Sequence, residues 1–428
     1  MGGTLLKVGA CQKEITPPLG TELSGYVRKH RPAHKIHDPL TANFLWIEDR
    51  STRLLFISVD VLMLEHSFCR RLKKRIASHM NIPEDSILLA ATHTHSAPGV
   101  HFYRNGPDRN SYWESRLLKI LFAGAAEAQD NRRDALFGHG TGNVRIGTNR
   151  RESDGPLDTS LFIASFVAEN RIPIAVIANY GCHPVVLDEK NSQISSDYIG
   201  YFREKLRVRL EWDIPVCFFS GACGDVNPIQ RGNFLIAEDY GRRLADMAYE
   251  VIGRSNYSTR MNISHAVTKM TLPFQEIPTL NEAEREVMEA TVKLRQVEDK
   301  GDNEGEIRAK RAHLLWAEEI RALVKKGQIS TAEEIEIQSF RMGRALFINS
   351  PVEIFAETSN KLREKFTDYH IVPVGCANGY FGYLPGSGSY EAGGYELEEA
   401  HKYTGYLPYS NESEGIFLSA VSEIVPDP

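Results

Sequence analysis

The chain has 428 residues, of which 42% are hydrophobic and 25% are charged, a composition typical of a soluble globular protein with a large core. Its formal net charge of −6, from 50 basic and 56 acidic residues, gives no support for nucleic-acid binding, which usually shows a basic surplus. The sequence contains no apolar run of about 18 residues and no charged n-region followed by an apolar core at its N-terminus, so we predict neither a membrane span nor a signal peptide.

The six cysteines are scattered along the chain without the CxxC spacing of metal or redox motifs. Cys182, Cys217 and Cys376 lie in apolar runs. We therefore expect buried free thiols and a cytoplasmic protein.

The first strong element is a near-continuous apolar run over 54–62, which is typical of a strand covered on both faces. Asp60 interrupts it, and such a buried carboxylate either orients a ligand or caps a loop. A helix over 64–80 and a strand over 86–91 complete a parallel crossover unit. This strand leads directly into a His-x-His motif, His93-Thr94-His95, which could reach a common cleft at a strand end.

A helix over 111–130 precedes a glycine-rich stretch at 138–147. The stretch does not fit the GxGxxG pattern, so we interpret it as a strand edge and turn instead of a phosphate loop. Arg150 follows on a polar loop, where it is either a surface arginine or a ligand for a carboxylate or oxyanion.

Two later strands end in polar residues in the same way. The apolar run over 172–180 leads to His183. A single histidine is more often a core residue, but with histidines after two strands a shared metal and buried core histidines are equally open alternatives. A strand over 216–219 ends in a turn containing Asp225 and Asn227, which either hydrogen-bond a substrate or stabilise the turn. Helices over 198–212 and 236–252 follow these two strands.

The segment 276–335 is dense in charged residues at helical spacing, and we interpret it as a surface helical hairpin. A structural excursion is the favoured interpretation, and a lid is the alternative. After a strand over 345–349, Glu353 falls in the first turn of a helix predicted over 352–366, where the helix dipole alone would favour an acid. A strand over 371–375 then opens into a loop rich in tyrosine and glycine, suited to lining a pocket.

The alternation of buried strands and helices predicts one large α/β domain over residues 1–428, with the segment 276–335 as a helical insertion. We expect a large mixed, mostly parallel sheet flanked by helices. Ligands of such sheets bind beyond the strand ends, where all the candidate polar residues fall.

Taken together, these motifs resemble the catalytic domain of the neutral (alkaline, non-lysosomal) ceramidase family. The matching segments occur in the order of the family and are His93–Pro98, Asn149-Arg150, Cys182–Pro184, Gly224–Pro228, Pro351–Glu353, and the tyrosines Tyr383 and Tyr395.

The resemblance implies a zinc-dependent hydrolase in which zinc-bound water attacks the substrate. The implied zinc ligands are His93, His183, Glu353 and Tyr383, a set that leaves room for a water molecule. His95, Arg150 and Tyr395 would surround the scissile carbonyl and stabilise its oxyanion.

The chain departs from the family pattern at Asn227, where the family has a serine, and asparagine cannot serve as a nucleophile. This favours direct attack by zinc-bound water. We also expect this chain to lack the C-terminal β-sandwich of the family. The first hypothesis is cleavage of an amide in a small or amphiphilic N-acyl substrate. The alternatives are cleavage of an ester or glycosidic bond in a soluble sugar-like substrate, or a non-catalytic protein that binds metal or ligand.

Overall fold

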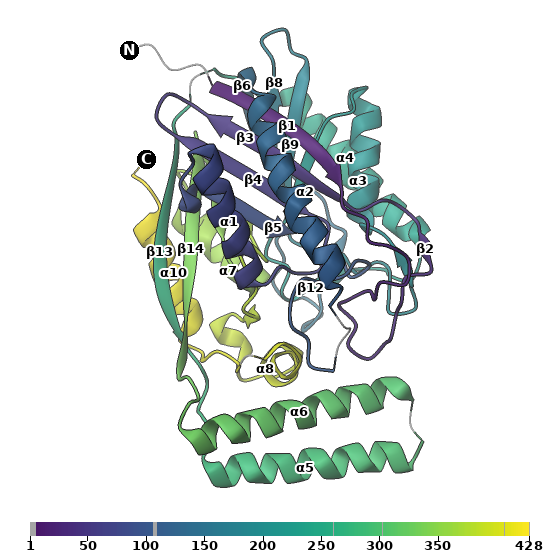
Figure 1. The fold of residues 1–428 in the computed structure, drawn as a ribbon. Helices are drawn as coiled ribbons and strands as arrows, with labels where there is room; N and C mark the ends of the chain where they lie inside the picture. Colours follow the sequence, from purple (N-terminus) through teal and green to yellow (C-terminus); the bar gives the residue numbers. More distant parts are fainter. Residues whose placement is uncertain (1–5, 106–108, 260, 302, 406, 428) are drawn as a thin grey trace.

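The computed structural model describes residues 6–105, 109–259, 261–301, 303–405 and 407–427 (Figure 1). Its largest element is an eight-stranded mixed sheet. In spatial order the strands are β11 (Val216–Ser220), β9 (Pro173–Tyr180), β8 (Ser160–Val167), β6 (Arg133–Asn143), β1 (Leu6–Glu14), β3 (Thr41–Glu48), β4 (Arg53–Val59) and β5 (Ile87–Ala91).

The prediction of a large mixed sheet flanked by helices is confirmed, but the prediction that it is mostly parallel is wrong. Among the described strands of this sheet, the parallel pairs are β11 with β9 and β4 with β5, and the other neighbours are antiparallel. Short connections join β3 to β4 and β8 to β9, which permits hairpins but no crossover helix. The strands are apolar on both faces because helices cover one face and a second sheet covers the other.

The second sheet packs against the first through an aromatic core. Its strands are, in spatial order, β13 (Ile263–Pro273), β14 (Ala332–Met342), β15 (Ala345–Asn349) and β17 (His370–Val374). The ring of Phe56 from β4 contacts Phe340 and Phe347 from this sheet edge-on, at 5.3 and 5.2 Å between ring centroids. The two sheets thus form the middle layers of the molecule.

Helices form the two outer layers. Those packed on the eight-stranded sheet are α1 (His66–Met80), α2 (Ser111–Asp130), α3 (Tyr198–Leu210) and α4 (Phe234–Arg254). Those packed on the four-stranded sheet are α7 (Ala356–Lys365) and α10 (Ser413–Ile424). Figure 1 shows α1 and α2 lying across β1, β3 and β4, and α10 beside β13.

The eight-stranded sheet curls until its edge strand β11 touches the inner face of β3 and β4. The Ser58 hydroxyl donates to the backbone oxygen of Phe218 at 2.6 Å, and the backbone N–H of Val216 donates to the side chain of Asn43 at 3.3 Å. These bonds satisfy backbone groups on the free edge of β11. The curl also brings the ends of β5 and β11 together, since the Ser220 hydroxyl at the end of β11 donates to the backbone oxygen of Thr92, and β9 pairs with β11.

The prediction that the glycine-rich stretch at 138–147 lies at a strand edge is wrong. Most of the stretch lies in β6, between β8 and β1. Its glycines allow α4 to approach closely: a Cβ on Gly142 would lie 2.3 Å from the Met247 sulfur. The stretch holds no helix N-terminus, in agreement with our exclusion of a phosphate loop.

The predicted helical hairpin is present as α5 (Leu280–Asp299) and α6 (Glu304–Lys326), which lie side by side below the sheets in Figure 1. A capping box between Thr279 and Glu282 starts α5, and Gly327 in the left-handed region ends α6. The predicted end of the segment is wrong, because β14 begins at Ala332.

Helix α6 is bound to loops of the main body. The guanidinium of buried Arg104 donates to Glu319 of α6 at 2.9 and 2.5 Å, and Arg28 forms an ion pair with Glu306. Arg308 donates to the backbone oxygen of Val27. These contacts favour a structural role for the hairpin over a lid. The assignment of residues 1–428 to one catalytic domain stays a prediction.

The remaining elements are short. They are β2 (Lys35–Ile36), β7 (Gly147–Asn149), β10 (Gln193–Ile194), β12 (Val226–Pro228), β16 (Glu353–Ile354), β18 (Tyr383–Leu384), α8 (Tyr395–Glu398), α9 (His401–Thr404) and the 3-10 turns η1 (Glu84–Ser86) and η2 (Ser387–Ser389). All six cysteines are buried and free, as predicted. Within the described residues, no helix combines the length and apolar character needed to cross a membrane.

Candidate metal centre

His93 lies just beyond β5 in a conformation that aims its ring into the protein. Its φ of 68° is in the left-handed region, which is unfavourable for this residue type and typical of functional sites. The Nδ1 atom lies 2.8 Å from the backbone oxygen of Leu62. Because a carbonyl only accepts hydrogen bonds, Nδ1 carries the proton and the Nε2 lone pair is left available.

His183 follows β9 and is held in the same way. Its Nδ1 lies 3.2 Å from the backbone oxygen of Val226, which also accepts the His183 backbone N–H at 3.0 Å. The Nε2 atom is therefore again the free nitrogen. Both histidine side chains are 1% exposed.

The prediction that Glu353 lies in the first turn of a helix is wrong. Glu353 lies in the short strand β16, and α7 begins only at Ala356. The backbone N–H of Glu353 donates to the backbone oxygen of Gly382, which pairs β16 with β18. The helix dipole therefore does not explain this acid. The register places Glu353 directly opposite Tyr383.

Three of the predicted ligands converge. Oε2 of Glu353 lies 2.9 Å from Nε2 of His183 and 3.5 Å from Nε2 of His93. None of these three buried atoms has a hydrogen-bond partner among the described residues. Burial raises the pKa of Glu353, and positive charge at His93 and His183 would lower it well below its ordinary value. Because both rings keep a free lone pair on Nε2, a bound cation is the group that would supply this positive charge. Unpartnered imidazole nitrogens facing an ionised carboxylate fit a divalent cation.

Tyr383, the fourth predicted ligand, is half-buried in β18 beside Glu353. Burial and the charge of Glu353 raise the pKa of its phenol well above the ordinary value, and Arg150 opposes this shift. A phenolate at this position would therefore depend on a cation for its charge.

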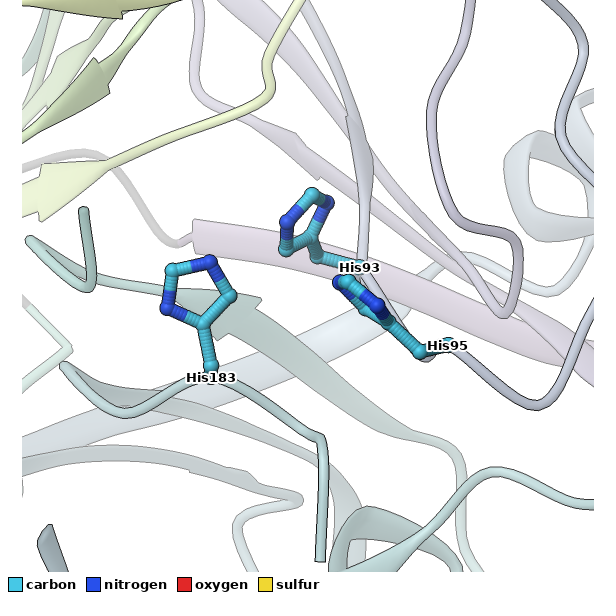
Figure 2. A group of neighbouring side chains, drawn as sticks. All are labelled: His93, His95 and His183. Carbon is cyan, nitrogen blue, oxygen red and sulfur yellow. The ribbon is translucent and has the colours of Figure 1, made fainter. Parts of the chain in front are cut away.

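His95 joins the two ligand histidines, as Figure 2 shows. Its ring centroid lies 5.1 Å from that of His93 and 6.0 Å from that of His183, and neither of its ring nitrogens has a hydrogen-bond partner in the described structure. One ring nitrogen of each of the three histidines lies within 4.8 Å of the others. Burial lowers the pKa of His95 well below its ordinary value, and the neighbouring histidines lower it further. The geometry therefore places a neutral His95 next to the centre and within reach of a shared ion.

Gly25 forms one wall of the His95 site. A Cβ at this position would lie 2.3 Å from Nδ1 of His95, and the φ of Gly25 is +97°. If His95 faces the scissile carbonyl, as the sequence resemblance implies, Gly25→Ala lowers kcat/KM by about a hundred-fold, because a displacement of about 1 Å at a reacting group can cost that much. Metal content, measured by atomic emission, should stay unchanged, since His93, His183 and Glu353 keep their contacts.

The matched control is Gly20→Ala. Gly20 also has a positive φ, +86°, but its added Cβ would meet nothing within 4 Å. It therefore carries the backbone strain without the collision. Equal kinetic losses in the two variants would show that strain alone is responsible.

Sequence reasoning missed three further groups around the centre. The Tyr380 hydroxyl donates to Oε1 of Glu353 at 2.8 Å, so the oxygen that faces away from the histidines is also fixed. The thiol of Cys376 lies within 4.8 Å of ligand atoms of His93 and Glu353, and the thiol of Cys223 lies within 4.8 Å of ligand atoms of His183 and Glu353. Burial and Glu353 raise the pKa of both thiols well above the ordinary value.

Tyr380→Phe tests the importance of the outer oxygen of Glu353. Loss of this hydrogen bond should weaken metal affinity by about ten- to a hundred-fold, as for other groups that orient a ligand. A competition titration with a chromogenic chelator measures the change. Tyr390→Phe is the control, because its hydroxyl donates to backbone oxygens of Tyr409 and Ser410 instead. An unchanged affinity in Tyr380→Phe would contradict the expected role.

Arg150 and Tyr395, predicted to face the substrate, lie together near Tyr383. The Arg150 guanidinium carbon lies 5.5 Å from the Tyr383 ring centroid and 5.6 Å from that of Tyr395. Tyr395 opens α8 and is 46% exposed. The tyrosine- and glycine-rich loop thus contributes to this site, as predicted. It also contributes the buried Glu396, another residue that sequence reasoning missed.

The two predicted substrate-binding residues differ in their surroundings. Both carboxylate oxygens of buried Asp225 accept bonds from the protein itself, at 2.8 Å from the Asn149 side chain and 2.8 Å from the backbone N–H of Ala356. These contacts favour the turn-stabilising alternative for Asp225. Asn227 is half-buried in β12, which pairs with β7.

Asp60, for which two roles were open, anchors a buried network. It forms an ion pair with Arg203 at 2.7 Å and accepts the hydroxyl of Thr92, the residue before His93. It therefore supports the strand end that carries the histidine without facing the centre itself.

Comparison with known proteins identifies similar sequences. Residues 6–136 match the family model of the N-terminal part of neutral/alkaline non-lysosomal ceramidases. The chain is 33% identical over 218 residues to the neutral ceramidase of Drosophila pseudoobscura pseudoobscura and 34% identical over 97 residues to that of Drosophila melanogaster. These stretches cover 46% and 22% of this chain, but only 31% and 14% of the lengths of the two relatives.

Solved structures share the fold over nearly the whole chain. A ceramidase complexed with C2 has a TM-score of 0.74 at 17% identity, and 98% of this chain covers 75% of that one. The neutral ceramidase from Pseudomonas aeruginosa has a TM-score of 0.72 at 18% identity, with 99% and 75% covered. At these identities the likeness shows the fold alone.

Proposed function

We propose that this chain, which is similar to neutral ceramidases over part of its sequence and shares their fold, is a zinc-dependent hydrolase that cleaves an amide bond in an N-acyl substrate. The observation that carries the proposal is the meeting of three unpartnered buried atoms, Nε2 of His93, Nε2 of His183 and Oε2 of Glu353. Nitrogen and carboxylate ligands of this kind are typical of catalytic zinc sites.

In this proposal His93, His183, Glu353 and Tyr383 hold the metal. When bound there, zinc would lower the pKa of a water molecule to about 7 and so supply hydroxide at neutral pH. The backbone oxygens of Leu62 and Val226 fix the proton of each histidine on Nδ1, so that both Nε2 atoms stay available as ligands.

The residues next to the metal ligands bind and polarise the substrate carbonyl. Arg150 donates to the oxygen on which negative charge develops, and Tyr395 adds its hydroxyl from the opposite loop. His95, neutral and without a hydrogen-bond partner among the described residues, would accept a proton from the attacking water and pass it to the amine nitrogen as the C–N bond breaks. Asn227 has no nucleophilic side chain, so the proposed route needs no acyl-enzyme.

The test uses the purified chain, stripped of metal by a chelator and then supplied with zinc or with magnesium. Both preparations are assayed on matched chromogenic N-acyl amides, acyl esters and glycosides. The expected result is amide hydrolysis that returns with zinc and not with magnesium. Selective hydrolysis of esters or glycosides would contradict the proposal that the chain cleaves an amide bond. Zinc binding without turnover of any probe would indicate a non-catalytic protein.

A further inference from the structure

Glu396 is a buried carboxylate shared by two arginines. Its Oε1 accepts from Nε of Arg150 at 2.7 Å and lies 2.5 Å from Nη2 of the same residue. Its Oε2 accepts from Nη1 of Arg151 at 2.5 Å. The Glu396 side chain is only 2% exposed, so water does not compete with the two arginines for its oxygens. Short charge-assisted hydrogen bonds of this kind are among the strongest in proteins.

The first arginine faces the proposed substrate site. Its backbone N–H donates to the backbone oxygen of Asp225 at 2.7 Å, which fixes the start of the side chain, and Glu396 fixes its end. Between these two points the guanidinium lies beside the rings of Tyr383 and Tyr395. Glu396 therefore determines which way the free side of the Arg150 guanidinium points.

The second arginine holds the loop that carries Tyr395. Nη2 of Arg151 donates to the backbone oxygen of Gly393 at 2.6 Å and to that of Ser389 at 3.0 Å. Gly393 and Gly394 have φ angles of 61° and 104°, so this part of the loop is bent where only glycine bends easily. The loop has backbone hydrogen bonds of its own, such as Gly393 N–H to the oxygen of Tyr390 at 3.2 Å, and the Arg151 contacts connect this bend to Glu396.

We propose that Glu396 is a positioning residue: by pairing with Arg150 and Arg151 at once, it aims Arg150 at the substrate carbonyl and fixes the Tyr395 loop beside it. The role given to Arg150 rests on the proposed hydrolase function. The fixing of the Tyr395 loop is independent of that function. One carboxylate between two guanidiniums leaves one positive charge uncompensated, which suits a site where an oxyanion forms.

The variant that tests the proposal is Glu396→Gln, which keeps the shape of the side chain. The amide of glutamine has one oxygen, so it can accept from only one of the two guanidiniums. Its NH2 group is a donor and would face the N–H donors of the other guanidinium. We expect faster hydrogen–deuterium exchange in the segment 386–398 and a fall in kcat/KM of about ten- to a hundred-fold, carried by kcat. Zinc content should not change, because the hydrogen bonds of Glu396 go to Arg150 and Arg151 and to none of the four proposed metal ligands, His93, His183, Glu353 and Tyr383. Glu396→Asp, which keeps the charge but shortens the reach, should give intermediate values.

A double-mutant cycle separates positioning from general damage. If Glu396 acts through Arg150, then Arg150→Gln combined with Glu396→Gln is no slower than Arg150→Gln alone. Multiplied losses in the double variant would overturn the proposal, because they would show an independent effect of Glu396. Glu391→Gln is the control, since Glu391 is an exposed acid in the same loop.

The exchange measurement does not depend on turnover. If the wild-type chain hydrolyses no probe, the proposed function fails, while faster exchange in Glu396→Gln still supports the fixing of the loop. Unchanged exchange in that variant overturns the inference whatever the activity of the wild-type chain.

Discussion

Glu353→Gln is expected to abolish both metal binding and hydrolysis while leaving the fold intact. The amide is isosteric with the carboxylate, but it removes the only negative charge among the three converging atoms. Loss of the metal removes several kcal/mol of transition-state stabilisation, which corresponds to roughly three orders of magnitude in rate. Atomic emission measures the metal, steady-state assays measure the rate, and circular dichroism checks the fold.

Glu357→Gln is the matched control, since Glu357 lies four residues further along the chain, in α7, and pairs with Lys361 instead of the histidines. It should retain the metal and the activity of the wild-type chain. Full turnover by metal-free Glu353→Gln would contradict the metal-dependent mechanism.

The pattern of apolar strands predicted where His93 and His183 lie, because each follows such a strand. The full ligand set with Glu353 and Tyr383 was implied by the family resemblance and stays a prediction. The strands ending before His93 and His183 are recognisable as β5 and β9, and α2 begins and ends at the residues expected, Ser111 and Asp130. Strand direction was not predictable, because a strand covered on both faces looks the same in sequence whether its neighbour is parallel or antiparallel. The start of α7 was missed because β16 is only two residues long and depends on pairing with β18.

The residues that complete the site were beyond sequence reasoning for a different reason. Glu396 meets Arg150 from 246 positions away, and Tyr380 is one of several tyrosines in its loop. No local pattern distinguishes these residues from their neighbours, since their roles arise from contacts made only after the sheets have packed. The tyrosine- and glycine-rich composition did identify the loop as part of a pocket, but it did not identify which of its members act.

Asp60 is expected to be the most damaging position outside the centre. Its carboxylate is fully buried and accepts bonds from Arg203, Thr41, Thr92 and Ser196. These partners come from β3, the end of β5, and α3 with the turn before it, so the network ties three parts of the fold together.

Asp60→Ala leaves the Arg203 guanidinium buried without its carboxylate and should lower the free energy of unfolding by ~3–5 kcal/mol. Urea denaturation followed by circular dichroism measures this loss. Asp213→Ala is the control: Asp213 also pairs with an arginine of α3, Arg207 at 3.5 Å, but its side chain is 95% exposed, and such pairs contribute little. Equal stability of the two variants would contradict the structural role of Asp60. Since Thr92 precedes His93, the stability loss in Asp60→Ala should be accompanied by weaker metal binding, which Asp213→Ala should not show.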